Sequence, residues 1–336
     1  MKAPLCRRRP LLLSWLLPWC GPAAALQPLK PLVDMPLRRL RLPRGGFGAD
    51  YVIVPVDLPG QPTQEFVLDS GMTLELVTPA LKAKLKLKPL RSAEAVTAGG
   101  TRVYDFTEIT GASVGGIALP TLHASVTHFP MEHIEVGHDV VGMLGLEFMD
   151  HFDVDLDFPN GRLRLWQPGD GAANAIKDGL NAIPTAVLGG TLLAVRVAAR
   201  GSPQPFIGII DTGASFSTLS MGVARLAGVR VDDKDAFEDA PRLWGIGIDG
   251  RPMNLPIVRV PLQFDTGAVT AEGFEAAAVV PHPHPCAVGD LPVFSETLGP
   301  ARGEYAALIG LDVLALGRTV FAGGTSSNRT LYWKPA

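Results

Sequence analysis

The sequence predicts an all-β protein of two related β-barrel-like lobes with a few short helices. Its 37 Gly and 30 Pro residues suit many turns between short strands. Apolar residues make up 47% of the chain and charged residues only 19%, a composition that supports buried cores and argues against disorder. A series of strands and turns occurs twice within 336 residues, a length that suits two domains.

The first 25 residues have the features of a targeting peptide. Lys2 and residues 7–9 give a basic start, residues 11–17 form a short apolar core, and residues 23–25 offer a small-residue cleavage site. The apolar run is short for a bilayer span. We expect entry into the secretory pathway, with an N-terminal anchor or a transit peptide for a plastid or another organelle as alternatives, and no stable membrane span after leader removal.

The remaining chain divides into four regions. Residues 26–48 are rich in Pro and Arg and are expected to form either a linker or a removable pro-segment. The N-terminal lobe is expected over residues 49–168, a second linker over residues 169–185, and the C-terminal lobe over residues 186–336.

The charge balance gives no reason to expect nucleic acid as a partner. The first 25 residues contain four basic and no acidic side chains, so 26 basic and 33 acidic side chains remain, a net charge of −7. Cys286 is the only cysteine outside the leader, so no intrachain disulfide can form once the leader is removed, which is unusual for a secreted protein.

Each copy of the repeat begins with two strands and an acidic turn. Residues 56–71 and 197–213 both read as a strand, a Pro/Gly turn and a second strand, followed by Asp-Ser-Gly or Asp-Thr-Gly. A carboxylate at the end of a buried strand is costly unless the protein needs it there. Asp69 and Asp211 are therefore candidate functional residues.

The later elements also repeat. A helix-like segment follows each acidic turn, then an apolar pair with Gly, then a closing strand that ends in Trp, at residues 78–87, 141–148 and 162–166 and again at 219–227, 307–313 and 329–333. A third Asp-Thr-Gly, at residues 265–267, stands between two strand-like runs. We expect it to be an ordinary hairpin turn.

The combination of Asp-Ser/Thr-Gly after an apolar strand, a following helix and a late apolar-apolar-Gly, present twice, resembles the retropepsin-like aspartic proteases. The resemblance covers residues 50 to 334 or so. Retropepsins usually assemble one active site from two identical chains, whereas here the copies are fused, as in the bilobal pepsin arrangement. The resemblance implies a monomer that is an intramolecular pseudo-dimer and binds a peptide or protein substrate in extended conformation between its lobes.

The resemblance assigns the chemistry to Asp69 and Asp211. One carboxylate acts as base on a bound water and the other donates a proton to the scissile carbonyl, and the sequence does not say which is which. The hydroxyl groups of Ser70 and Thr212 are expected to tie the two turns together. No metal and no organic cofactor is required.

The same resemblance names supporting residues around the dyad. Gly71 and Gly213 are expected to permit the sharp turns. In the family a Gly-containing hairpin, the flap, closes over the substrate, and residues 97–101 suit either such a flap or a simple turn. The flap candidates of the second copy are Trp244, Gly245, Ile246 and Gly247.

Met72 is a departure from the family, in which Ala or Ser usually follows the Gly of the motif. Met is larger than Ala, has no hydroxyl and can crowd the turn. The prediction is an active aspartic endopeptidase. The alternative is a catalytically weak or inactive peptide-binding protein with the same fold.

Three further groups of polar residues invite a functional interpretation. His123, His128, His133 and His138 recur every five residues, a spacing that fits neither a helix face nor a strand face, so no metal site is expected there. Residues 282–286 are expected to form an exposed loop because of their prolines. The acids of residues 152–158 are expected on the solvated face of a half-buried strand.

Overall fold

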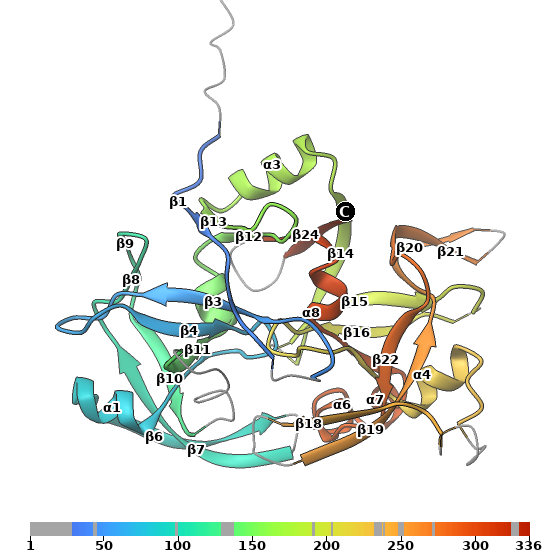
Figure 1. The fold of residues 1–336 in the computed structure, drawn as a ribbon, viewed down its shortest axis with the longest axis horizontal. Coiled ribbons are helices and arrows are strands. Elements are labelled where there is room, and N and C mark those ends of the chain that lie inside the picture. The colour runs from blue at the N-terminus through green and yellow to red at the C-terminus, as the bar shows by residue number, and fades with distance from the viewer. Residues whose placement is uncertain are drawn as a thin grey trace, which may run out of the picture.

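The computed structural model confirms an all-β fold with a few short helices, arranged as two lobes side by side (Figure 1). It describes residues 29–42, 46–97, 100–128, 138–189, 192–202, 204–231, 237, 239–247, 252–270, 273–323 and 329–336. The predicted leader lies outside the described residues. None of the helices in this part of the chain has the length and hydropathy needed to cross a bilayer.

The first lobe is built on an eight-stranded sheet. Its strands, in sheet order, are β2 (Arg38–Leu40), β3 (Tyr51–Val56), β4 (Gln64–Leu68), β11 (Val140–Leu144), β5 (Glu75–Val77), β10 (Leu122–Val126), β7 (Gly100–Ile109) and β6 (Pro89–Thr97). The short strands β8 (Ser113–Val114) and β9 (Ile117–Ala118) pair with each other, and the helices are α1 (Pro79–Leu85) and α2 (Leu146–Met149).

The second lobe repeats this strand order, so the repeat in sequence is a repeat in structure. The equivalent strands, from the counterpart of β3 onward, are β15 (Leu192–Ala199), β16 (Phe206–Ile210), β23 (Ala306–Ile309), β17 (Thr218–Leu219), β22 (His284–Val288), β19 (Pro252–Val260) and β18 (Arg242–Ile246). The lobe also contains the hairpin β20 (Leu262–Thr270) and β21 (Gly273–Val279) and the helices α4 (Met221–Leu226), α6 (Pro292–Leu298), α7 (Pro300–Gly303) and α8 (Leu311–Leu314).

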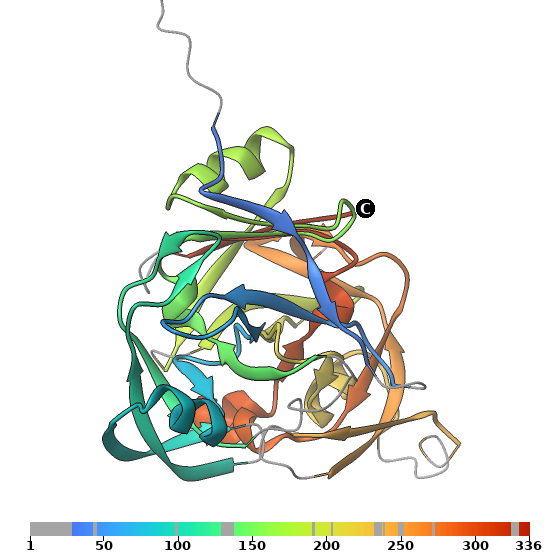
Figure 2. The same ribbon diagram turned by 60° about the vertical axis from the view of Figure 1, so that its left-hand side comes forward.

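A six-stranded layer joins the lobes. Its order is β1 (Val33–Pro36), β13 (Arg162–Trp166), β12 (Asp153–Asp157), β24 (Gly317–Ala322), β25 (Thr330–Pro335) and β14 (Asn181–Leu188), with the lobe boundary between β12 and β24. Helix α3 (Asp170–Lys177) covers this layer on its outer side (Figures 1 and 2). The layer fixes how the two lobes face each other.

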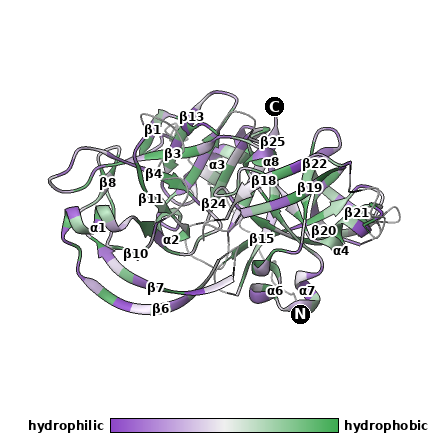
Figure 3. Ribbon diagram, turned by 60° about the horizontal axis from the view of Figure 1, so that its bottom comes forward, coloured by the Kyte–Doolittle hydropathy of each residue, from purple (hydrophilic) through white to green (hydrophobic). Residues whose placement is uncertain are grey.

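Local signals explain how the helices start. The side chains of Thr78 and Ser220 cap α1 and α4 by accepting hydrogen bonds from the backbone N–H groups of Leu81 and Val223, at 3.1 and 3.2 Å. One buried apolar cluster runs through both lobes. Strands β4 and β11, which lie inside it, are largely hydrophobic, whereas β6 carries hydrophilic and hydrophobic stretches along its length (Figure 3).

The N-terminal region contributes strands to both sheets. Strand β1 pairs with β13 of the joining layer and β2 pairs with β3 of the first lobe. In the second lobe the single strand β14 makes both contacts, pairing with β25 and then with β15. Residues 33–40 are thus the structural counterpart of residues 181–188, and the range expected as the second linker contains α3 and the start of β14.

The acids of β12 are not on a solvated face, which corrects the sequence-based expectation. Asp153, Asp155 and Asp157 are all buried. Asp155 accepts hydrogen bonds from Arg318 at 2.7 and 2.8 Å, and Asp153 accepts from backbone N–H groups at the start of α3. Because basic side chains and a helix start supply the partners, the carboxylates can be buried without being left unpaired.

The third Asp-Thr-Gly is not a hairpin turn. Asp265 lies within β20 where the register against β21 is irregular, and the strand runs on to Thr270. Its buried carboxylate accepts a hydrogen bond from the backbone N–H of Gly267 at 2.6 Å and pairs with Arg196 at 3.2 Å. The motif therefore forms a bulge in the strand.

Candidate active site

The two acidic turns follow equivalent strands and rest on equivalent supports. Asp69 follows β4, and its backbone N–H donates to the carbonyl of Leu144 at 2.8 Å. Asp211 follows β16, and its N–H donates to the carbonyl of Ile309 at 3.0 Å. Leu144 and Ile309 end the parallel neighbours β11 and β23. The apolar-apolar-Gly segments therefore pack behind the two turns.

Ser70 and Thr212 lock the two turns together. The backbone N–H of Ser70 donates to Thr212 Oγ1 at 2.9 Å, and the N–H of Thr212 donates to Ser70 Oγ at 3.0 Å. Each hydroxyl then donates across the lobe boundary, Ser70 to the carbonyl of Ile210 and Thr212 to the carbonyl of Leu68, both at 2.9 Å. Both side chains are fully buried, so these four bonds define one rigid contact.

The two glycines bring each aspartate against the other turn. A Cβ atom at Gly71 would lie 2.6 Å from the Cγ of Asp211, and one at Gly213 would lie 2.3 Å from the Cγ of Asp69. Each glycine N–H also donates to the aspartate of its own turn at 2.8 Å. Only glycine leaves room for the two carboxyl groups to approach each other.

The carboxyl groups of Asp69 and Asp211 share an environment that favours one retained proton. Burial raises the pKa of Asp69 well above its ordinary value, and the neighbouring Asp211 carboxylate raises it further. Burial also raises the pKa of Asp211, but hydrogen bonds from Asp69, Gly213 and Ala214 oppose that rise. The pair therefore retains one proton at a pH where ordinary carboxyl groups are ionised.

Met72 leaves the first turn undistorted. Its N–H lies 3.3 Å from the carbonyl of Asp69 and its carbonyl accepts from Leu146 at 2.8 Å. Ala214 makes the equivalent two contacts at the same distances, with Asp211 and Leu311. The Met72 side chain packs against the small apolar cluster that includes Ile53 and Met143. The expected crowding of the turn is therefore absent.

The N-terminal segment reaches the second turn, which sequence reasoning missed. The N–H of Ala49 donates to the carbonyl of Ser215 at 2.9 Å, and the rings of Phe47 and Phe216 meet edge-on with centroids 6.1 Å apart. Burial raises the pKa of Tyr51, a hydrogen bond with Ser215 lowers it, and the two dyad charges raise it further. Tyr51 thus lies near the dyad, at a position that no motif marks.

A second missed group stands behind each turn. In the first lobe Glu75 and Glu147 face each other, and Glu147 accepts two hydrogen bonds from His123. In the second lobe, Ser217 and His284 both contact the carboxylate of Asp312, at 2.7 and 3.0 Å. The repeat contained the signal, because position six after each Asp and position two after each late Gly are polar in both copies.

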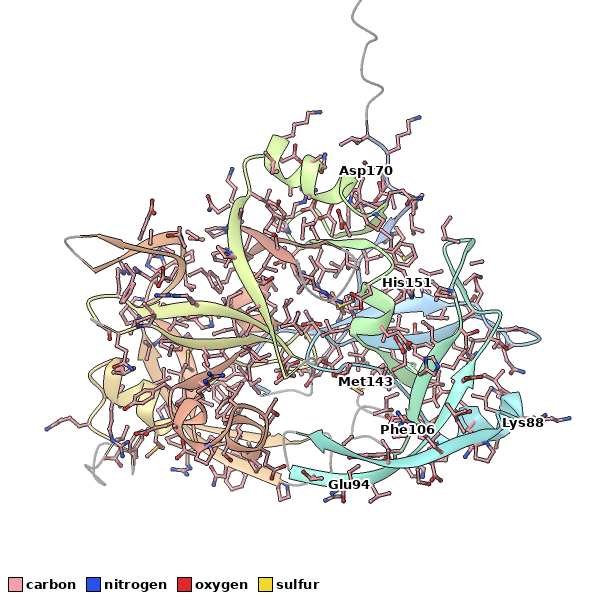
Figure 4. All side chains as sticks on the ribbon, turned by 180° about the vertical axis from the view of Figure 1, so that it is seen from behind. Lys88, Glu94, Phe106, Met143, His151 and Asp170 are labelled. Carbon is pink, nitrogen blue, oxygen red and sulfur yellow. The ribbon has the colours of Figure 1, made fainter. Side chains whose placement is uncertain are left out.

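Two long hairpins, β6–β7 and β18–β19, lie along the same side of the molecule (Figure 1). Figure 4 shows Glu94 and Phe106 on the first hairpin, below Met143 of β11. Thr101, next to its turn, donates to Glu296 of the second lobe's helix α6 at 2.8 Å. Thr97, Gly100 and Thr101 thus belong to a hairpin that contacts the opposite lobe, whereas residues 98 and 99 of the expected flap range lie outside the described residues.

The flap candidates of the second copy belong to the β18–β19 hairpin. The Trp244 side chain is 72% exposed, whereas Leu243 beside it packs inward in a cluster with Phe216. Gly245 pairs with Met253 in the hairpin, and Ile246 and Gly247 follow at the end of β18. Exposure of Trp244 means that it faces away from the core of the lobe.

Two histidines of the five-residue series pair with carboxylates. His123 contacts Glu147, and His138 Nδ1 lies 2.7 Å from Glu65; His133 is outside the described residues. The described part of the chain holds no group of three or more His, Cys, Asp and Glu side chains suited to a metal ion. His284 and Cys286 lie buried in β22, so residues 284–286 are not the exposed loop that their prolines suggested.

Comparison with known proteins gives a match to one family model and to solved structures. Residues 54–148 match the family model described as aspartyl protease. No curated protein matches the sequence significantly. The crystal structure of basic 7S globulin from soybean is similar over 91% of this chain and 95% of that chain, with 12% sequence identity and a TM-score of 0.48.

Proposed function

Residues 54–148 match the aspartyl protease family model, and on that premise we propose that the chain is an aspartic endopeptidase whose dyad is Asp69 and Asp211. The observation that carries the proposal is the mutual approach of the two carboxyl groups, each set against the other turn's glycine. An ordinary pair of structural carboxylates would be separated or paired with basic side chains, since like charges repel. This pair is held together by Ser70 and Thr212.

The chemistry follows from the different environments of the two carboxyl groups. Asp69, whose pKa is raised further, keeps the shared proton, and Asp211 takes a proton from a water molecule between them. The water oxygen attacks the scissile carbonyl carbon, and Asp69 gives its proton to the carbonyl oxygen. Asp211 then gives the proton that it took from water to the amine nitrogen, and the C–N bond breaks as the tetrahedral intermediate collapses. One hydroxyl of the intermediate returns a proton to Asp69, so the dyad ends the cycle with the one proton that it held at the start.

The proposed substrate is a peptide or protein segment in extended conformation. The hairpins β6–β7 and β18–β19 offer strand edges to which an extended segment can add by backbone hydrogen bonds. The joining layer connects the two lobes within one chain, so a single chain carries both aspartate turns. This arrangement supports a monomer. We propose secretory localisation on the basis of the leader sequence, with an organelle as the alternative.

A peptide-binding protein without efficient catalysis is the second candidate. Met72 favours it, because this side chain brings no hydroxyl to the dyad and the equivalent residue of the second turn is Ala214. The intact geometry of the first turn favours catalysis.

Cleavage of an unfolded protein by the chain that starts at Leu26 tests the proposal. The assay spans about pH 3 to about pH 7, a range that covers ordinary and raised carboxyl pKa values. We expect acid-favoured cleavage that pepstatin inhibits and that both Asp69→Asn and Asp211→Asn abolish. A folded wild type that binds a peptide without cleaving it would support the second candidate instead. Loss of cleavage in only one variant would contradict a shared dyad.

A further inference from the structure

Glu75 is a fully buried acid directly behind the first turn. Its Oε1 accepts a hydrogen bond from the backbone N–H of Phe148 at 2.9 Å. Its Oε2 is also buried and receives no hydrogen bond from any donor in the described part of the chain. An ionised carboxylate with one unpaired oxygen would be costly in this position.

The group that faces Glu75 is the carboxylate of Glu147 on α2. Glu147 accepts hydrogen bonds from the backbone N–H and from Nδ1 of His123, both at 2.7 Å. Burial would raise the pKa of Glu147, but its hydrogen bonds with Glu75 and His123 lower it overall. Burial raises the pKa of Glu75 well above its ordinary value, and Glu147 raises it further. Of the two, Glu147 therefore loses its proton at the lower pH.

The remaining charges around the pair are few. His123 comes from β10, and its Nε2 lies 3.7 Å from Glu108 of β7. Strand β11, which pairs with β5 on its other side, contains only apolar residues and glycine. No basic side chain among these neighbours contacts Glu75 itself, so ionisation of Glu75 would place two negative charges side by side.

The second lobe shows what this position does. Ser217, the counterpart of Glu75, donates its hydroxyl proton to Asp312, and its Oγ accepts from the N–H of Gly310 at 3.0 Å. Asp312, the counterpart of Glu147, is held in turn by His284. Both lobes thus place an oxygen-bearing side chain, an acid and a histidine behind the aspartate turn. Glu75 can match Ser217 only while it carries a proton.

The pair is connected to the first aspartate turn by short backbone contacts. Leu146 and Glu147 donate their N–H groups to the carbonyls of Met72 and Thr73, at 2.8 and 3.0 Å, and Phe148 donates to Glu75. Helix α2 and the turn are therefore fixed to each other at three consecutive residues. Two negative charges between them would push them apart.

We infer that Glu75 is a positioning residue of the proposed active site: as a neutral carboxylic acid it donates a hydrogen bond to Glu147 and so holds the Asp69 turn against helix α2. The inference rests on the proposed function, because the turn matters for catalysis only if Asp69 acts in it. It adds a second proton, outside the dyad, whose loss disturbs the site as the pH rises.

Two variants of Glu75 separate this role from simple space filling. Glu75→Gln keeps the size and a neutral N–H donor, whereas Glu75→Ala removes the contact. At about pH 4 we expect Glu75→Gln to keep kcat within about threefold of the wild type and Glu75→Ala to lower it about tenfold or more, with KM changed by less than about threefold in both. As the pH rises, Glu75→Gln should lose less of its kcat than the wild type. Equal losses in the two variants, or none in Glu75→Ala, would overturn the inference.

A spectroscopic measurement keeps the inference testable if the protein does not cleave peptides. In the Asp69→Asn/Asp211→Asn double variant the dyad no longer titrates, so the infrared carbonyl band of a protonated carboxylic acid at about pH 6 reports on other groups, ordinary Glu being ionised there. We expect such a band, and we expect Glu75→Gln to remove it. Absence of the band would contradict the inference. Presence of the band in a protein whose wild type does not cleave peptides would contradict only the proposed function.

Discussion

Ser70 and Thr212 exchange hydrogen bonds across the lobe boundary, each backbone N–H donating to the other residue's hydroxyl at 2.9 and 3.0 Å. The same hydroxyls donate to carbonyls that precede the opposite aspartate. The exchange makes the position of either aspartate depend on the other lobe, so neither lobe can form the site by itself. It also predicts that a single lost hydroxyl affects both turns.

Thr212→Val tests that dependence, since it removes the hydroxyl and preserves the shape of the side chain. Ser70 N–H then loses its acceptor and the carbonyl of Leu68 loses its donor, both in a buried site. We expect a loss of about 2–4 kcal/mol in the free energy of unfolding, measured with urea, because unpaired buried groups cost about 1–3 kcal/mol each. Cleavage should fall as well, and Thr212→Ser should restore both.

The matched control is Thr63→Val, which removes an exposed hydroxyl that donates to Asp57. Surface substitutions of this kind usually change stability by less than about 0.5 kcal/mol. Equal effects of the two Thr→Val changes would contradict a special role for the contact between the turns.

Gly213→Ala should be among the most damaging small substitutions in the chain. The new methyl group would lie 2.3 Å from the Cγ of Asp69, and the surrounding turn is tied down by Thr212. We expect loss of cleavage and a lower thermal midpoint, since overpacking costs about 1–3 kcal/mol or more. Gly245→Ala is the control for stability, because its Cβ would meet nothing closer than 3.8 Å. An unchanged midpoint in Gly213→Ala would contradict the close approach of the turns.

The raised pKa of Asp69 predicts how stability depends on pH. A carboxyl group whose pKa is raised by folding contributes stability that is complete below its unfolded pKa of about 3.9 and is lost as the pH rises through the folded value. Asp69→Asn cannot ionise, so its stability relative to the wild type should increase from acidic to neutral pH. Urea unfolding midpoints across that range measure the difference. A stability difference that stays constant across this pH range would contradict the raised pKa of Asp69.

The aspartate turns could be predicted from sequence because their signal is local and repeated. Strand, Asp-Ser/Thr-Gly and a later apolar-apolar-Gly recur in the same order in both copies, and the decoy at Asp265 lacks that context. The prediction of a hairpin turn at Asp265 is nevertheless wrong, because the side chain that pairs with the buried carboxylate of Asp265 is Arg196, 69 residues away. Short-range rules describe turns well when no distant side chain competes for the same carboxylate.

Long-range pairing also explains the other corrections. The acids of β12 alternate with apolar residues as they would on a solvated face, and their burial depends on Arg164, Arg318 and the backbone N–H groups at the start of α3. The prolines around His284 indicate a loop, but residues 284–288 form strand β22, in which the side chains of His284 and Cys286 are buried in the core. Sequence pattern gives the period of a strand and not the chemistry of the surface that it meets.

Removal of residues 26–48 should destabilise the protein. Strand β1 supplies one edge of the joining layer, and Leu40 of β2 is fully buried in the apolar cluster beside the first turn. Losing the buried side chains of Val33 and Leu40 would cost about 1.5–3 kcal/mol each, in addition to the lost strand pairing. A chain that starts at Ala49 should therefore unfold at lower urea concentration than one that starts at Leu26.

A chain that starts at Pro31 is the control, because it keeps both strands. We expect it to match the chain that starts at Leu26. Equal stability and higher activity in the chain that starts at Ala49 would instead identify residues 26–48 as a removable inhibitory segment.

The hydrogen bond between Thr101 and Glu296 is expected to restrict the motion of the hairpin β6–β7. It is exposed, and it joins β7 of the first lobe to α6 of the second. A hydrogen bond to a charged group is worth about 1.5–3 kcal/mol at most, and exposure reduces it. Glu296→Ala should therefore raise amide hydrogen exchange in the hairpin several-fold, while α3 exchanges at its former rate. Glu296→Gln still offers an oxygen acceptor to Thr101, so its exchange rate in the hairpin should lie between those of the wild type and Glu296→Ala. If exchange in β6 and β7 is unchanged by Glu296→Ala, the contact does not hold the hairpin against the second lobe, and the pairing of β6 with β7 alone sets its position.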